Sequence, residues 1–270
     1  MTTITGPLGT GPAGAEPTLA RTPVRGTRIT LTTVRTIAGK EFRSYFQSPI
    51  AYIFITAFLV LTHFFFFRGF FVVNQATMRE FFSLIPVVFL FFVPALTMRL
   101  WAEERKLGTT ELLLTFPVED WEAVLGKFAA AMGFLAVALG CTLPLTLTVI
   151  LLGRPDGGAI IGGYLGALLL GGTYMAMGLW LSSLTSNQIV AFILALFGSF
   201  ALFMIGEPIV LSAIPQVLGL RSFCAYLSVG YHFDSLGRGV VDLRDLLYYV
   251  SVIAFFLFLN VRSIESRKWS

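Results

Sequence analysis

Charged residues are scarce in this chain of 270 residues. They make up 13% of the sequence, whereas hydrophobic residues make up 56%. Soluble domains carry about 25% charged residues, and a soluble protein of this composition would have to bury its apolar surface in one core. The deficit therefore predicts an all-helical protein with several membrane spans, most of whose surface faces lipid. The net charge is +4.

Cysteine and catalytic motifs are also nearly absent. Only Cys141 and Cys224 occur, which excludes a disulfide framework and a CxxC metal site. The Gly-Lys pairs at 39–40 and 126–127 lack the upstream glycine of a phosphate loop, and HExxH and GxSxG do not occur. The sequence thus predicts no enzyme, no metal site, no cofactor bound by this chain and no nucleic acid partner.

Residues 1–27 and 28–46 differ in pattern. The first segment is rich in Gly, Pro and Thr without the apolar run of a signal peptide, so we expect a disordered tail. In the second, apolar residues recur at helical spacing from Leu31 to Tyr45, which predicts an amphipathic helix on the membrane; a short soluble helix is the alternative. Its basic residues lie off the apolar stripe: Arg35, Lys40 and Arg43.

Six later stretches approach the ~20 apolar residues of a spanning helix. They are residues 50–73, 81–98, 128–152, 159–181, 189–210 and 246–261. An even number of spans places both termini on one side. That side carries 13 of the Lys and Arg residues and the other carries 6, so both termini should be cytoplasmic.

Small residues repeat in the fourth predicted span, where Gly158, Gly162 and Gly166 are spaced by four. Such spacing permits close helix approach, either inside one bundle or between two chains. The region 211–245 follows the fifth span and is half apolar. We expect short helices there that dip into the outer membrane region and pack on the bundle.

Ionisable residues near the outer side are candidates for a pathway or gate. Glu207 lies at the outer end of the fifth span, where a charge is costly and often functional; alternatively it caps a helix or pairs with Arg221 or Arg238. In residues 228–249, His232, Asp234 and Arg238 stand among charges of both signs. The mixture favours internal ion pairs over a binding patch.

The charged segment, residues 103–117 (EERKLGTTELLLTFP), lies between the second and third spans. Its leucines interleave with charged residues, so a helix there could insert its apolar side into a groove on a soluble partner. A surface helix resting on lipid is the alternative. The predicted topology places this segment in the cytoplasm.

The same segment resembles the cytoplasmic region of ABC-2-type permeases. The family pattern E-x-x-x-G-T-x-E-L-L-L-x-x-P-V is met by Glu104, Gly108, Thr109, Glu111, Leu112, Leu113, Leu114, Pro117 and Val118. The run YHFDSLGRGVVDLRDLLYY is similar to the outer loop of the gliding-motility-associated permease subfamily. The resemblance covers about residues 36–268.

The resemblance implies a six-span permease subunit in a bacterial plasma membrane, most often an exporter. Two subunits, identical or homologous, would pair, and a separate ATPase carrying ATP and Mg would dock on each. The family's docking elements match the helix before the first span, with Arg35, Lys40 and Arg43, and the charged segment. In that segment the implied contact residues are Glu103, Glu104, Arg105, Gly108, Thr109, Glu111, Leu112, Leu113 and Pro117.

Two other functions stay open. A membrane scaffold could use the same ATPase contact to transmit force without transport, and the bulky aromatics at 64–67, 89, 91 and 92 would suit a closed interior. A permease for copper-site maturation would need soft ligands along one path. The candidates are scattered singly and are more typical of core packing: His63, Met132, Cys141, Met175, Met177 and Met204.

Overall fold

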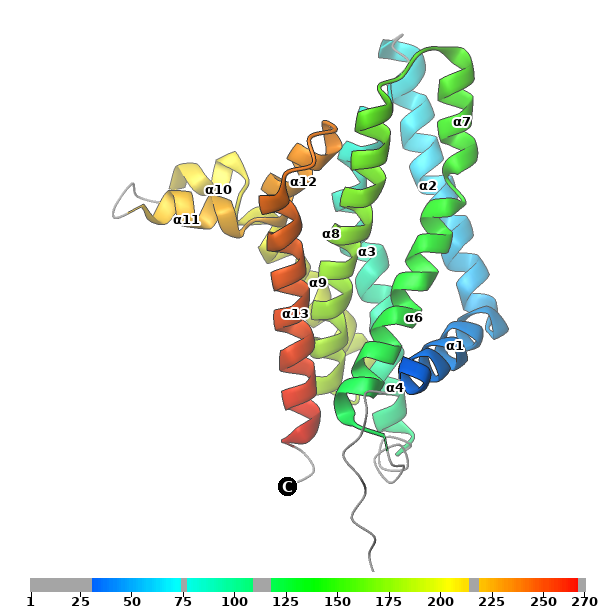
Figure 1. Ribbon diagram of the computed structural model, residues 1–270, viewed down its shortest axis with the longest axis vertical. Helices are drawn as coiled ribbons and strands as arrows, with labels where there is room; N and C mark the ends of the chain where they lie inside the picture. Colours follow the sequence, from blue (N-terminus) through cyan, green and yellow to red (C-terminus); the bar gives the residue numbers. More distant parts are fainter. Residues whose placement is uncertain (1–30, 74–76, 109–117, 214–218, 267–270) are drawn as a thin grey trace, which may run out of the picture. The chain divides into compact units, whose positions relative to one another are not determined.

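The computed structural model describes residues 31–73, 77–108, 118–213 and 219–266, and all regular structure in these ranges is helical. The predicted tail at 1–27 lies outside the described residues. Figure 1 shows the helices, which are α1 (Leu31–Gln47), α2 (Pro49–Val73), α3 (Arg79–Thr97), α4 (Arg99–Lys106), α6 (Asp120–Gly140), α7 (Leu143–Leu152), α8 (Gly157–Leu184), α9 (Gln188–Met204), α10 (Pro208–Ala213), α11 (Leu220–Leu227), α12 (Val229–Gly237) and α13 (Leu243–Glu265).

Among the described residues, five helical segments are long and apolar enough to cross a membrane: Pro49–Phe70, Arg79–Lys106, Asp120–Leu152, Gly157–Leu184 and Leu243–Glu265. The span predicted at 189–210 corresponds to α9, a shorter apolar helix of 17 residues. At 1.5 Å per residue it is about 25 Å long, against a hydrocarbon core of about 30 Å. It ends early because Pro208 begins a separate short helix, α10, after a turn at Glu207.

Two of the membrane-length segments are interrupted at specific residues. Met98 separates α3 from α4, four residues after Pro94, and Cys141 with Thr142 separates α6 from α7. Proline has no backbone N–H to donate and its ring crowds the preceding turn, which explains why α7 restarts with Pro144 as its second residue. The interruption at Cys141 and Thr142 divides the predicted span 128–152, whereas Met98 is the last residue of the predicted span 81–98.

Helix α8 lies at the centre of the bundle and contacts α3, α6, α9, α12 and α13. Its small-residue stripe is covered within the chain. A Cβ on Gly162 would lie 2.5 Å from the Leu236 carbonyl oxygen, and one on Gly166 would lie 3.0 Å from Leu236 Cβ. Of the two predicted uses of this spacing, the structure therefore shows packing inside one bundle, against α12.

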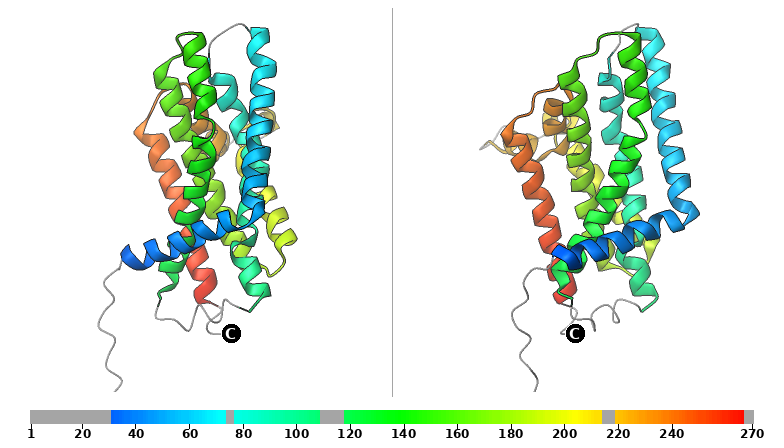
Figure 2. Two further views of the ribbon diagram at one scale, coloured as in Figure 1. Left: turned by 90° about the vertical axis from the view of Figure 1, so that its right-hand side faces the viewer. Right: turned by 45° about the vertical axis from the view of Figure 1, so that its right-hand side comes forward.

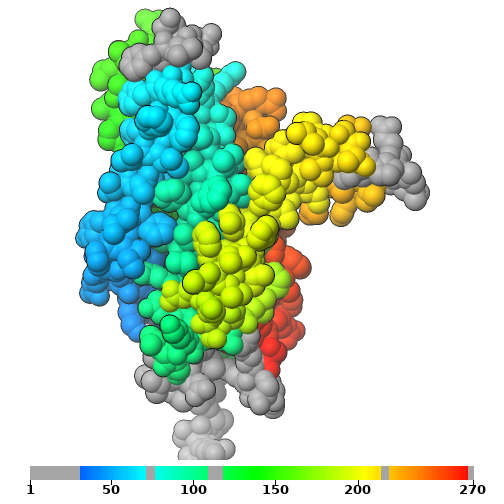
Figure 3. Space-filling view, turned by 180° about the vertical axis from the view of Figure 1, so that it is seen from behind, coloured from blue at the N-terminus to red at the C-terminus, as the bar shows by residue number. Residues whose placement is uncertain are grey.

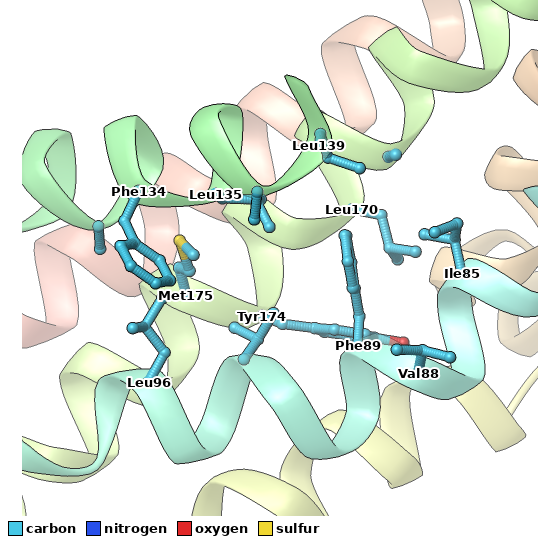
Figure 4. Packing of buried hydrophobic residues seen from close by; sticks show 14 of the residues in the cluster. Ile85, Val88, Phe89, Leu96, Phe134, Leu135, Leu139, Leu170, Tyr174 and Met175 are labelled. Atoms are coloured by element: carbon cyan, nitrogen blue, oxygen red, sulfur yellow. The ribbon is translucent and has the colours of Figure 1, made fainter. Parts of the chain in front are cut away.

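The hydrophobic core lies between α3, α6 and α8. Figure 4 shows Phe89 and Leu96 from α3 packing toward Phe134 and Leu135 of α6, with Met175 of α8 among them. Phe89 and Met175 are fully buried. Met175 thus packs as an apolar side chain, and no cluster of three His, Cys, Asp or Glu that could hold a metal occurs in the described ranges.

Short helices follow α9, as predicted for 211–245. Helix α12 packs on α3, α8 and α13 and buries Val229, Phe233 and Leu236. Helices α10 and α11 pack on each other, and α11 also contacts α12; Figure 1 shows both extending to the side of the bundle. Their Ile209 and Phe223 are exposed, so α12 is the short helix that packs firmly on the bundle.

Candidate functional site

Helix α1 crosses the bundle at a steep angle to the long helices, and it seats on α6 (Figure 2). The contact depends on small residues of α6. A Cβ on Gly126 would lie 2.6 Å from Ile37 Cγ2, and one on Gly133 would lie 3.2 Å from the Phe42 ring. The rings of Tyr45 and Phe134 lie 5.1 Å apart. The predicted amphipathic helix is thus confirmed as a helix, and its apolar side is held against α6.

The ammonium of Lys127 joins three helices at this end of the bundle. Its Nζ lies 3.1 Å from Glu41 Oε1 on α1 and 2.5 Å from Glu104 Oε1 on α4, and 4.9 Å from the centre of the Trp101 ring. Lys127 is 1% exposed, whereas the two glutamate side chains are 20% and 26% exposed. A lysine so deeply buried requires an opposite charge, and two carboxylates on different helices meet that need.

Helix α4 is fastened to the end of α8 by serine hydroxyl and carbonyl groups. The backbone N–H groups of Trp101 and Ala102 both donate to Ser182 Oγ at 3.2 Å, and Ser182 Oγ donates to the Met98 carbonyl at 2.9 Å. One hydroxyl therefore satisfies backbone groups released where α3 gives way to α4. Arg105 Nη1 also donates to the Ser183 carbonyl at 2.8 Å.

Helix α6 begins with a capping box. The Glu119 side chain accepts from the backbone of Glu122, while the Glu122 carboxylate accepts from the Glu119 N–H at 3.2 Å. Acidic residues in a first turn are also favoured by the helix dipole, and Trp121 Nε1 donates to Glu119. The cap fixes the point at which the chain returns into the bundle after the charged segment.

The residues predicted for ATPase docking are only partly described. Glu104 and Arg105 of α4 are held in the contacts above, while Glu103 is exposed. Gly108 has φ +71°, the left-handed conformation that favours glycine, and it ends the turn after α4. On α1, Arg35, Lys40 and Arg43 are exposed. Five further predicted residues lie outside the described residues: Thr109, Glu111, Leu112, Leu113 and Pro117.

Sequence reasoning did not select Glu41 and Lys127 as site residues. Lys127 directly precedes the predicted span 128–152, and on a helix this position faces the bundle interior. The desolvation cost of a lysine there is a signal that a carboxylate must lie nearby. The spacing along the chain gives no means of identifying Glu41, which is 86 residues away.

The predicted outer residues fall into two groups. His232 is buried, and its Nδ1 lies 2.7 Å from Asp245 Oδ1 while its Nε2 lies 3.0 Å from the Tyr226 carbonyl oxygen. Its ring stacks on Tyr248 at 3.9 Å. His232 thus holds α12 to the first turn of α13.

Glu207 and Asp234 line one cavity of about 450 Å³ between α3, the end of α9 and α12. Within the described ranges Glu207 forms no ion pair, so the predicted pairing with Arg221 or Arg238 is not seen. Arg238 donates from Nε to the Asp234 carbonyl at 3.1 Å. Desolvation raises the pKa of the Asp234 carboxyl and the Arg238 charge opposes the rise. Asp234 is nevertheless an exposed residue, so the rise is screened by solvent.

Comparison with protein families gives one result that covers most of the chain. The family model described as "ABC-2 family transporter protein" matches residues 35–261. The match spans most of α1 through most of α13 and includes both the Lys127 contacts and the outer helices. A search of curated proteins gives no match.

Proposed function

Because the chain belongs to the ABC-2 family of transporter proteins, we propose that it is the six-span permease subunit of an ATP-driven exporter in a bacterial plasma membrane. Membership makes it a membrane transport component that does not itself hydrolyse ATP. A separate ATPase subunit binds ATP and Mg, and a second permease chain, identical or homologous, completes the transporter.

Helix α9 supplies the sixth crossing in this proposal. It carries no charged residue, and its N-terminus is capped by Asn187, whose side chain accepts from the Ile189 N–H at 2.9 Å. Local thinning of the bilayer accommodates a short span at modest cost. Six crossings place both termini in the cytoplasm, together with α1 and α4. The exposed apolar faces of α2 and α9 then meet lipid or the second permease chain.

The ATPase contacts α1 and the charged segment, and the contacts of Lys127 carry the motion inward. This is the observation that supports the mechanism: one buried ammonium holds α1 and α4 to α6. Since Ser182 and Arg105 fasten α4 to α8, a displacement of α4 reaches the central helix. No part of this path requires bond chemistry in this chain.

At the opposite end, α12 closes the exit of the pathway. Support comes from the cavity that Glu207 and Asp234 share, and from the packing of α12 on α3 and α8. The contact between His232 and Asp245 keeps α12 on α13 while the exit is closed. Arg238 restrains the end of α12 through the Asp234 carbonyl.

Docking and transmission are tested by two variants measured side by side with the co-purified ATPase. Glu111→Ala combined with Leu112→Arg should abolish ATPase association. Lys127→Met should still bind the ATPase. The ATPase should then hydrolyse ATP at the same rate with this variant as it does without any permease. Arg262→Gln, which breaks an exposed ion pair with Glu265, is the control and should behave as the unaltered chain. Unchanged association in the first variant would reject the docking role, and unchanged hydrolysis in the second would reject the transmission role.

A further inference from the structure

A cleft of about 460 Å³ lies where α1 and α4 meet the first turn of α2. Three cations and three carboxylates line it: Lys40, Arg99, Lys127, Glu41, Glu103 and Glu104. It adjoins a chamber of about 130 Å³, and the two share Tyr45, Ile50, Arg99 and Glu103 as lining residues. Ile50 is the second residue of α2, and Gln188 of the chamber is the first of α9. The cleft is therefore level with the ends of apolar helices, where headgroups lie.

Polarity falls along a line from this cleft into the bundle. The chamber adds Ala51, Phe54 and Leu96 to the shared charged residues. Beyond it, sharing Phe54 and Leu96, is a wholly apolar void of about 20 Å³. Figure 4 shows Leu96 of α3 close to Phe134 of α6, and both residues line this void. A void of that size holds about one water, so a longer chain must leave the chamber elsewhere.

An exit for such a chain lies over α3. The chamber is lined by the first turn of α2, the end of α3 and the first residue of α9. In Figure 3 the surface of α3 is visible between α2 and α9. On this helix Val87 and Phe91 are 44% and 56% exposed. A hydrocarbon tail leaving the chamber would therefore lie against apolar side chains.

Two groups at the junction of cleft and chamber lack a polar partner. The Tyr45 hydroxyl is buried and forms no hydrogen bond in the described structure. Arg99 packs over the Tyr45 ring at 5.1 Å, and no ion pair of Arg99 occurs in the described ranges. Burial raises the pKa of Tyr45, so its hydroxyl remains a donor at neutral pH. A buried donor beside an unpaired guanidinium fits an anion.

We propose that this cleft binds the phosphodiester headgroup of a membrane amphiphile between Arg99 and Tyr45, with the first methylenes of its tail in the adjoining chamber. Arg recognises phosphate oxygens with two parallel hydrogen bonds. Glu103 lines the same cleft and opposes a second negative charge, so a phosphodiester fits better than a phosphomonoester. The proposal does not depend on ATPase coupling.

Native mass spectrometry of the purified full chain without ATPase tests the site. Three probes are compared: dioleoyl phosphatidylethanolamine, dioleoylglycerol, which has the tails alone, and glycerophosphoethanolamine, which has the headgroup alone. The phospholipid should bind most tightly. Arg99→Gln should weaken it at least about tenfold, and Tyr45→Phe about threefold to tenfold, from the loss of hydrogen bonds to an anion.

Arg244→Gln is the matched control, because it removes the same charge from an exposed arginine in the first turn of α13, at the opposite end of the bundle, and it should leave binding unchanged. Tyr45→Phe removes only an unpartnered hydroxyl, so thermal unfolding should show a stable fold, and this variant decides the test if Arg99→Gln unfolds. The proposal is overturned by unchanged binding in both site variants. It is also overturned if Arg244→Gln weakens binding equally, or if glycerophosphoethanolamine binds as well as the phospholipid.

Discussion

The Nζ atom of Lys127 lies 2.5 Å from Oε1 of Glu104, and the two residues differ sharply in exposure. The lysine side chain is 2% exposed, whereas that of Glu104 is 26% exposed. Glu41, the second partner, is 20% exposed. A carboxylate that loses its partner here can gain water, but the ammonium cannot. Removing the carboxylates should therefore cost more stability than removing the ammonium.

This asymmetry predicts unequal effects of removing the two kinds of charge. Glu41→Gln with Glu104→Gln leaves a buried ammonium without a counter-ion, and we expect a loss of stability of about 3–5 kcal/mol. Lys127→Met leaves only partly exposed carboxylates and should cost less. Thermal unfolding in detergent measures both. The triple variant, which combines Glu41→Gln, Glu104→Gln and Lys127→Met, should be more stable than the double glutamine variant. A larger loss of stability for Lys127→Met than for the double glutamine variant would contradict the argument.

The seat of α1 on α6 predicts that Gly126→Ala is destabilising. The added Cβ would meet Ile37 at 2.6 Å, and overpacking of this kind costs about 1–3 kcal/mol. Gly140→Ala is the control, because nothing lies within 4 Å of its added Cβ; it should be neutral or stabilise by about 0.4–1 kcal/mol. Ile37→Ala removes Cγ2 but keeps Cβ, which would lie 2.8 Å from the added atom, so combining it with Gly126→Ala should restore the position of α1 only in part. Limited proteolysis of α1, with unfolding midpoints, reports the outcome.

The contacts of His232 predict a defined protonation pattern. Nδ1 faces the Asp245 carboxylate and Nε2 faces the Tyr226 carbonyl, and both oxygens are acceptors when Asp245 is ionised. The imidazole must then carry a proton on each nitrogen. Asp245→Asn can donate its amide N–H to Nδ1 instead, so the ring should become singly protonated.

Nitrogen-15 NMR of the histidine side chains can check this, because the chain has only two histidines. His63→Gln assigns the remaining signal to His232. We expect two protonated nitrogens in the unaltered chain and one in Asp245→Asn. Asp245→Ala, which leaves the ring without that partner, should lose about 1–3 kcal/mol of stability. A singly protonated ring in both proteins would show that the carboxyl itself holds the proton.

Composition and periodicity were sufficient to identify most helices of this fold. The runs at 50–73 and 246–261 match α2 and α13 closely because an apolar stretch long enough to cross a bilayer has few other stable conformations. The stretch at 189–210 ends six residues early, at Met204, because the turn before Pro208 outweighs the apolar character of Ile209 and Val210. Local backbone chemistry decided that boundary, and hydropathy could not.

The contacts around Lys127 were harder to predict from the sequence than the helices were. Arg35, Lys40 and Arg43 were selected because they lie off the apolar stripe of a helix that the family resemblance matched to a docking element, and they are exposed. Glu41 lies among them, yet it alone of the four contacts Lys127. Which charge turns inward depends on how α1 lies on α6, and that is set by packing of Ile37 and Phe42 over two glycines. No local pattern encodes this rotation.

Among the buried serines, Ser182 and Ser199 predict opposite outcomes for the same substitution. Both are 0% exposed. Ser182 Oγ accepts from two backbone N–H groups and donates to the Met98 carbonyl, so Ser182→Ala leaves buried groups unpaired and should cost about 1–3 kcal/mol. Ser199 Oγ has no partner in the described structure, so Ser199→Ala should be neutral or stabilising.

The Ser182 and Ser199 variants also distinguish an effect on fold stability from an effect on the transmission of motion from α4 to α8. Ser182→Ala releases the start of α4 from α8 while the contacts of Lys127 remain, so ATPase association should persist. The ATP hydrolysis of the assembled complex should lose its dependence on the permease, because the displacement of α4 no longer reaches α8. Ser182→Thr keeps a hydroxyl and should retain part of that dependence. If Ser182→Ala lowers the unfolding midpoint but leaves ATP hydrolysis as in Ser199→Ala, then Ser182 stabilises the fold and transmits nothing.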